Sequence, residues 1–130
     1  MDAKQLVAEA LDARENAYAP YSGYAVGAAL VTTKGTVFRG TNVENASYGL
    51  TICAERSAVT AMVTAGETDI AAIAVATEDG GSMCGACRQV VSEFGAKAKV
   101  FLASADGSFQ ATTADALLPG AFDGSKLRGK

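Results

Sequence analysis

The 130-residue chain contains no histidine and no tryptophan, and it has only two prolines and three cysteines. Histidine is the commonest metal ligand and a frequent general base in proteins, so without it the three cysteine sulfurs are almost the only ligands that this chain offers to a soft metal. Three is an odd number, so any disulfide would leave one thiol over. Nothing else in the sequence indicates an oxidising compartment. We therefore expect free thiols, either as small buried apolar groups or as metal ligands.

Positive charge and long apolar runs are also scarce. The chain has 11 Lys and Arg residues against 14 Asp and Glu, which gives a net charge of −3. A nucleic-acid-binding protein relies on clustered cations that neutralise phosphates, so this composition disfavours nucleic acid as a partner. No apolar run reaches the roughly 18 residues that span a bilayer, and the N-terminus has no signal-peptide core. We therefore expect a soluble cytoplasmic protein that binds neither membrane nor nucleic acid.

The apolar residues are spread along the whole chain and make up 49% of it, enough for one hydrophobic core in a single domain over residues 1–130. Their periodicity predicts helices over 3–18, 53–65, 85–94 and 114–118, and strands over 25–32, 36–42, 70–77, 99–104 and 108–112. This order predicts a three-layer α/β/α fold, with helices on both faces of a mixed five-stranded sheet. Gly27 and Gly40 fall inside two strands, where a missing side chain indicates a close neighbour or a bulge.

The three cysteines stand at the starts of two predicted helices, Cys53 at one and the Cys84/Cys87 pair at the other. A helix N-terminus favours the thiolate that binds metal, and a Cys-x-x-Cys spacing is typical of zinc sites. The fourth ligand of such a zinc is either a carboxylate, with Glu55 or Glu44 as candidates, or water, as in catalytic sites. In the second arrangement Glu55 is placed to take a proton from that water and pass it on.

Two other interpretations remain open at this level. A Cys-x-x-Cys redox motif would explain Cys84 and Cys87, but it leaves Cys53 and Glu55 without a role. A structural zinc in a non-enzymatic binding module would use an oxygen ligand to close the site. The residues favour zinc over redox chemistry and a catalytic zinc over a structural one.

Several separated motifs resemble those of the zinc-dependent cytidine deaminases, and together they cover nearly the whole chain. They are Cys53-Ala54-Glu55, Cys84-Gly85-Ala86-Cys87-Arg88-Gln89, and the stretches 18–22, 26–29, 42–49 and 117–122. The resemblance is to the small homotetrameric class, and it implies the cytidine-deaminase-like fold. It also implies hydrolytic deamination of free cytidine and 2′-deoxycytidine to uridine products and ammonia by a zinc-activated water. One Zn²⁺ per subunit and active sites shared between subunits are part of the same expectation.

The resemblance also assigns the metal side of the site. Cys53, Cys84 and Cys87 resemble the zinc ligands, and Glu55 resembles the proton shuttle. Arg56 resembles the arginine that offsets the charge of three thiolates. From position alone, Arg56 and Arg88 are both candidates to donate hydrogen bonds to the sulfurs, while the simpler interpretation of either is a surface arginine lying over apolar neighbours.

The substrate side is assigned in the same way. Asn42 and Glu44 resemble the pair that hydrogen-bonds the ribose, and the backbone of Ala54 is expected to face the pyrimidine. Tyr24 stands where the family usually has Phe, so its ring is expected to form a wall of the pocket while its hydroxyl is unexplained. Phe122 resembles the aromatic residue that a neighbouring subunit stacks on the base.

One position departs from the motif: Met83 precedes Cys84, where the family usually has proline. Proline would fix the backbone that leads into the helix, so we expect methionine to hold this metal-binding turn less stiffly. Other substrates stay open as well, since blasticidin-type antibiotic deaminases share the zinc motif. Deamination of a polynucleotide is disfavoured because the chain is acidic.

Overall fold

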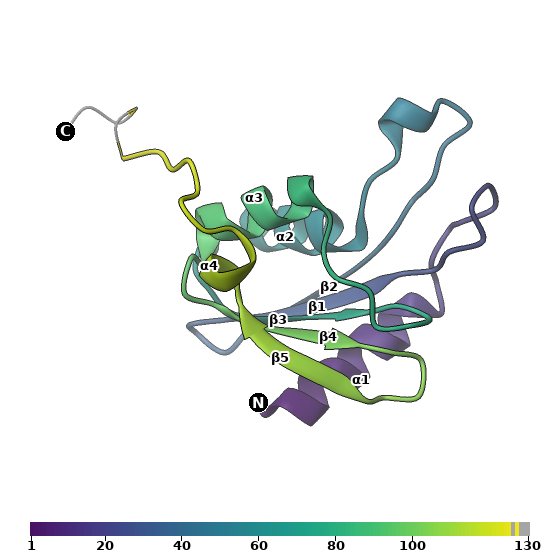
Figure 1. The fold of residues 1–130 in the computed structure, drawn as a ribbon, viewed down its shortest axis with the longest axis horizontal. Coiled ribbons are helices and arrows are strands. Elements are labelled where there is room, and N and C mark those ends of the chain that lie inside the picture. Colours follow the sequence, from purple (N-terminus) through teal and green to yellow (C-terminus); the bar gives the residue numbers. More distant parts are fainter. Residues whose placement is uncertain (126, 128–130) are drawn as a thin grey trace.

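Five strands form one mixed sheet at the centre of the molecule (Figure 1). In spatial order they are β2 (Val37–Thr41), β1 (Gly27–Thr32), β3 (Ile70–Ala76), β4 (Lys99–Ala103) and β5 (Phe109–Thr113). β3 and β4 are parallel, and the other neighbouring strands are antiparallel. The computed structural model describes residues 1–125 and 127, so the predicted domain boundary at Lys130 lies outside it.

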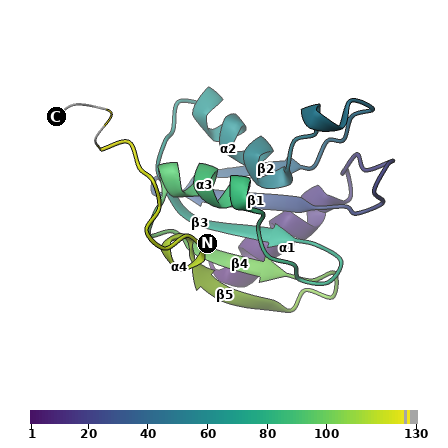
Figure 2. The same ribbon diagram turned by 45° about the horizontal axis from the view of Figure 1, so that its top comes forward.

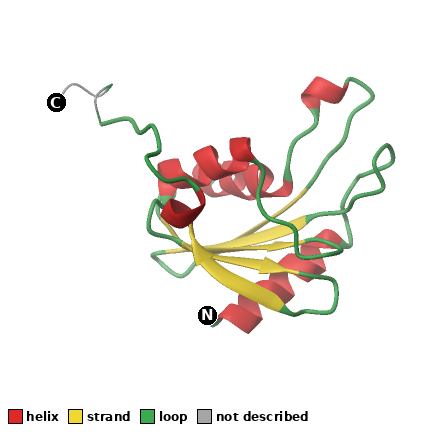
Figure 3. Cartoon of the chain, in the orientation of Figure 1, coloured by secondary structure: helices red, strands yellow, loops and turns green. Residues whose placement is uncertain are grey.

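Helices cover both faces of this sheet, as predicted (Figure 3). One face carries α1 (Ala3–Arg14), and the other carries α2 (Ala54–Thr64) and α3 (Gly85–Phe94), with the short α4 (Ala114–Leu117) following β5. A 3₁₀ turn, η1 (Tyr48–Leu50), lies in the loop between β2 and α2. Among the described residues, no helix combines the length and apolarity needed to cross a membrane.

The core consists of two apolar clusters separated by the sheet. Ile73 and Val75 of β3 point into the cluster under α2 and α3, and Ala74 and Ala76 point into the cluster under α1. β3 is therefore buried on both faces of the sheet over these four residues. β3 is the central strand, and the loop that follows its carboxyl end leads to the Cys84/Cys87 pair.

The first helix is shorter than its sequence pattern predicts. It starts with a capping box between Asp2 and Gln5, but it ends at Arg14 instead of continuing to residue 18. The Tyr18 amide donates to the Asn42 carbonyl at 3.0 Å, and the Tyr18 carbonyl accepts from the Glu44 amide at 2.9 Å. This pairing with a distant segment draws the chain out of the helix, and local periodicity contains no information about it.

The two glycines inside strands have close neighbours. A Cβ on Gly40 would clash with the Ala54 carbonyl and the Ala58 amide of α2, and one on Gly27 would clash with the backbone of α1 at Ala10. The register shift in the sheet lies elsewhere, after Val31. Both glycines therefore let a helix backbone pack directly on the sheet, and Gly40 does so at the start of α2.

We expect Gly40→Ala to lower the free energy of unfolding by about 1–3 kcal/mol, because the added methyl group must push α2 away from β2. Gly49→Ala is the matched control, since the space around Gly49 is open. Urea denaturation of both variants measures the difference. Equal stability of the two variants would contradict the close packing of α2 on β2.

Candidate active site

The three cysteines converge at the point where α2 and α3 begin. Their Sγ atoms all lie within 4.8 Å of one another, and the Cys53 and Cys84 sulfurs are 3.9 Å apart. Cys53 and Cys84 are the N-cap residues of the two helices, and Cys87 lies in the first turn of α3. Figure 2 shows these helices next to each other on one face of the sheet. The structure thus brings together all three predicted ligands.

The spacing and chemistry of this cluster fit a zinc ion. Two thiolates that bind a tetrahedral zinc, each at about 2.3 Å, lie about 3.8 Å apart, close to the separation of Cys53 and Cys84. All three cysteines are free thiols, and zinc prefers such soft sulfur ligands. The cluster could therefore hold one zinc ion with three protein sulfurs.

The cluster also brings together groups that become negative when they ionise. Burial, and then the charge of Glu55, raises the pKa of Cys87; burial and the charges of Cys84 and Glu55 likewise raise the pKa of Cys53. Burial acts to raise the pKa of Cys84 too, but hydrogen bonds from the Cys87 amide and from the neighbouring thiols lower the pKa overall. A divalent cation between the sulfurs would favour all three thiolates.

Glu55 lies in the first turn of α2, and only 4% of its surface is exposed. Burial raises the pKa of its carboxyl group, and its own backbone amide, the Cys87 thiol and the charge of Arg56 oppose that rise in part. Carboxyl groups perturbed in this way, within a cavity, are typical of functional sites. Glu55 is therefore placed beside the sulfur cluster as a carboxyl group that can exchange a proton.

A cavity of about 290 Å³ opens beside the cluster. Its walls include the predicted substrate-side residues Tyr24, Asn42, Glu44 and Ala54, together with Glu55, Cys53 and Cys84. This volume is near the lower end of the roughly 300–1,000 Å³ of small-molecule sites. One cavity thus joins the metal side and the substrate side of the predicted site.

Phe122 is the one residue predicted to contact substrate that does not line this cavity. It is 67% exposed and belongs to the C-terminal segment, which Figure 1 shows leading away from the body of the molecule. Its backbone carbonyl accepts a hydrogen bond from Gln89 Nε2 at 2.9 Å.

The family model described as "Cytidine and deoxycytidylate deaminase zinc-binding region" matches residues 1–103. The chain belongs to this family. A cytidine deaminase of Halalkalibacterium halodurans is 50% identical over 125 residues, which cover 94% of this chain and 95% of the relative. One from Sporosarcina psychrophila is 45% identical over 130 residues, covering 98% and 96%. The crystal structure of cytidine deaminase from Burkholderia pseudomallei is 50% identical and has a TM-score of 0.90, covering 94% of this chain and 100% of that one.

In this pocket, the two polar residues that are predicted to contact substrate are held by the loop that leads into β1. Asn42 Oδ1 accepts from the Val26 amide at 3.0 Å, and its Nδ2 donates to the Tyr24 carbonyl at 2.8 Å. Glu44 accepts from the Ser22 hydroxyl and from the Ser22 amide at 3.1 Å. These bonds lower the pKa of Glu44, so it is an ionised acceptor at the cavity wall.

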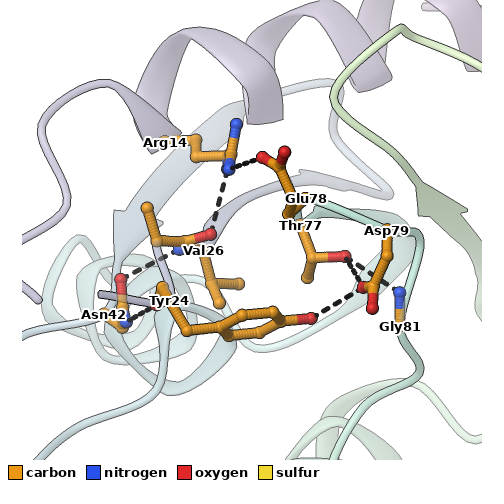
Figure 4. A network of polar contacts seen from close by, with 9 residues as sticks. Arg14, Tyr24, Val26, Asn42, Thr77, Glu78, Asp79 and Gly81 are labelled. Carbon is orange, nitrogen blue, oxygen red and sulfur yellow. Dashed lines mark hydrogen bonds and ion pairs between the residues drawn. The ribbon is translucent and has the colours of Figure 1, made fainter. Parts of the chain in front are cut away.

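The Tyr24 hydroxyl, unexplained by the sequence, has a partner in the structure. It donates to Asp79 Oδ1 at 3.0 Å, and Thr77 Oγ1 lies 3.4 Å from the same oxygen and accepts from the Gly81 amide at 2.9 Å (Figure 4). This network ties the Tyr24 ring to the loop after β3. The sequence contains no local signal for Asp79 or Ser22, because each acts on a residue that is distant along the chain.

Within the described residues, the two candidate arginines near the cluster donate to oxygen atoms and not to sulfur. Arg56 Nη2 donates to the Thr51 carbonyl at 3.3 Å, and in the described part of the chain its buried Nε has no hydrogen-bond partner. Arg88 donates from Nε, Nη1 and Nη2 to three oxygen atoms outside the cluster. Arg56 instead acts on the site through its charge, which opposes in part the rise that burial causes in the pKa of Glu55.

We expect the purified chain to bind one zinc ion per subunit and Cys87→Ser to lose most of it, because Cys87 supplies the most buried of the three sulfurs. Ala86→Ser is the matched control: it places the same hydroxyl group in the same helical turn and leaves every thiol intact. Elemental analysis after exhaustive dialysis measures the zinc content. Full zinc content in Cys87→Ser would rule out the three-sulfur site.

Proposed function

We propose that the chain catalyses the hydrolytic deamination of cytidine and 2′-deoxycytidine to uridine and 2′-deoxyuridine, with release of ammonia. The observation that carries the proposal is the single cavity that joins the sulfur cluster and buried Glu55 to Asn42 and Glu44. Such a cavity suits a small molecule with a reactive base at one end and a sugar at the other. The curated relatives that match nearly the full chain are named cytidine deaminases, which supports the same substrate class.

Glu55 is the proposed catalytic residue. A zinc ion held by the three sulfurs would supply Lewis-acid activation of a water molecule for attack on C4 of the pyrimidine. The Glu55 carboxylate takes up one proton from the attacking water and delivers it to N3. It then takes up the proton of the new C4 hydroxyl group and passes it to the amine, which leaves as ammonia while the C4 carbonyl forms. Because Glu55 is buried beside Cys53 and Cys84 in the cavity wall, its proton is directed to groups inside the cavity rather than to bulk water.

The opposite wall is proposed to bind the sugar and orient the base. Glu44 is an ionised acceptor, and a carboxylate has room for a ribose hydroxyl beside the bonds that hold it. Asn42 is 8% exposed and fixed by the backbone around Tyr24, so its amide needs little reordering when substrate binds. The Ala54 backbone and the Tyr24 ring then face the pyrimidine.

We also infer that the residues 1–130 act as one catalytic domain in a cytoplasmic homotetramer with shared active sites. The exposure of the Phe122 ring supports a role in the pocket of a neighbouring subunit. Val63, on the apolar helix α2, is exposed as well, and a subunit interface would cover it. Three free thiols suit the cytoplasm, where thiols stay reduced.

A substrate panel tests the proposed activity directly. We expect the zinc-loaded chain to release ammonia from cytidine and 2′-deoxycytidine, and not from blasticidin S or a single-stranded oligonucleotide. Glu55→Gln should keep zinc and fold but lose activity by several orders of magnitude, because an amide cannot accept and return the proton. Near-normal turnover by Glu55→Gln would refute the shuttle role, and blasticidin S as the only substrate would refute the nucleoside assignment.

Mixed oligomers test whether the pocket is shared. Phe122→Ala retains Glu55, and Glu55→Gln retains Phe122, so a site between one subunit of each kind contains both residues. We expect co-expressed, differently tagged subunits to be more active than the sum of the two variants alone. Verified hybrid oligomers that show no such gain would contradict a contribution of Phe122 to the neighbouring pocket.

A further inference from the structure

Arg88 connects three parts of the chain around the Cys84/Cys87 pair. Its Nε donates to the Met83 carbonyl at 2.8 Å, its Nη2 to Ser82 Oγ at 2.9 Å and its Nη1 to the Leu117 carbonyl at 2.8 Å. Side chains in a helix lean toward its N-terminus, so a residue in the first turn of α3 reaches back over the loop that precedes it. The planar guanidinium group holds its N–H donors in a fixed arrangement, and here all three of its nitrogen atoms donate.

The contact with Met83 bears directly on a predicted metal ligand. The Met83 carbonyl and the Cys84 amide belong to one planar peptide, so a hydrogen bond that fixes the carbonyl also fixes the position of the Cys84 Cα. Cys84 is the most exposed of the three cysteines, and its own side chain has little packing to hold it. Met83 is 3% exposed, so its burial anchors the other end of the same peptide.

We propose that Arg88 is a positioning residue for zinc, which holds the turn before Cys84 so that the three sulfurs keep their spacing. Proline before Cys84 would restrict this turn covalently, and in this chain the Arg88 hydrogen bonds and the buried Met83 side chain provide the restraint instead. The inference rests on the proposed zinc site and extends it to a residue that contacts neither sulfur nor substrate. It also accounts for an arginine whose donors all point away from the sulfur cluster.

The same helical turn also holds the C-terminal segment. Arg88 Nη1 holds the Leu117 carbonyl at the end of α4, and the adjacent Gln89 holds the Phe122 carbonyl. Loss of Arg88 therefore has two separable consequences: a looser turn before Cys84 and a looser attachment of α4. The experiment must distinguish the first from the second.

Zinc affinity, measured by competition with a chromogenic chelator, tests the proposal in the full chain. We expect Arg88→Met, which keeps the aliphatic stem and removes every donor, to weaken zinc binding by about 10–100-fold, as is usual when a supporting partner of a metal ligand is lost. Arg88→Lys should weaken it less and serves as the test if the Met variant does not fold. Arg39→Met is the control, since Arg39 pairs with Glu9 and Asp12 of α1 on the other face of the sheet.

Rescue by proline separates the two consequences. In the Arg88→Met background, Met83→Pro should restore most of the zinc affinity, because the ring restricts the same turn. It cannot restore the bond to Leu117. Wild-type affinity in both Arg88 variants would overturn the proposal, and so would a loss that proline does not rescue.

The wild-type chain, measured alongside, separates this inference from the proposed function. Zinc uptake without deamination of either nucleoside would refute the proposed reaction while the affinities of the variants still decide the role of Arg88. A wild-type chain that takes up no zinc would overturn the metal site and the role of Arg88 together.

Discussion

The close approach of three sulfur atoms and one carboxyl group is the constraint on which the rest of the site depends. Groups that ionise to the same charge repel one another, and burial adds to the cost of charging them, as the raised pKa values of Cys53, Cys87 and Glu55 indicate. The fold offsets this electrostatic cost with the positive ends of two helix dipoles, since α2 and α3 both begin at the cluster. Arg56 adds one positive charge, and a zinc ion would add the largest.

This constraint explains why the helices must be placed so closely. The position of α2 is set by direct packing of its backbone on Gly40, and that of α3 by its apolar face and by the loop that follows the central strand. A shift of either helix moves a sulfur, because the ligands sit at the helix starts and not on long side chains. The core on this face of the sheet therefore determines the geometry of the metal side as well as the stability of the fold.

The features that the sequence predicts well are those with a local or repeated signal. The periodicity predicts the five strands of the sheet and the four α-helices that pack around it. The spacing of the three cysteines predicts their convergence, since both helix starts follow strands of the same sheet. The end of α1 at Arg14, the partner of the Tyr24 hydroxyl and the bond from Arg88 to Leu117 could not be predicted in this way. Each depends on a contact between distant segments, and a single sequence contains no signal for which distant oxygen atom a given donor will meet.

Two parts of the cavity wall are held in place by different interactions, so they differ in how readily they can change. The sulfur end rests on helix starts and a packed core, so a small change there disturbs the metal. The wall formed by Tyr24, Asn42 and Glu44 rests on hydrogen bonds between loops: Glu44 to Ser22, Asn42 to the backbone around Tyr24, and Tyr24 to Asp79. The Glu44 and Tyr24 bonds are exposed, and hydrogen bonds of this kind contribute little individually and can be exchanged without unfolding the chain. Substitutions that alter the sugar or base preference are therefore expected in the loops at 21–26 and 78–82, while the metal chemistry stays fixed by α2 and α3.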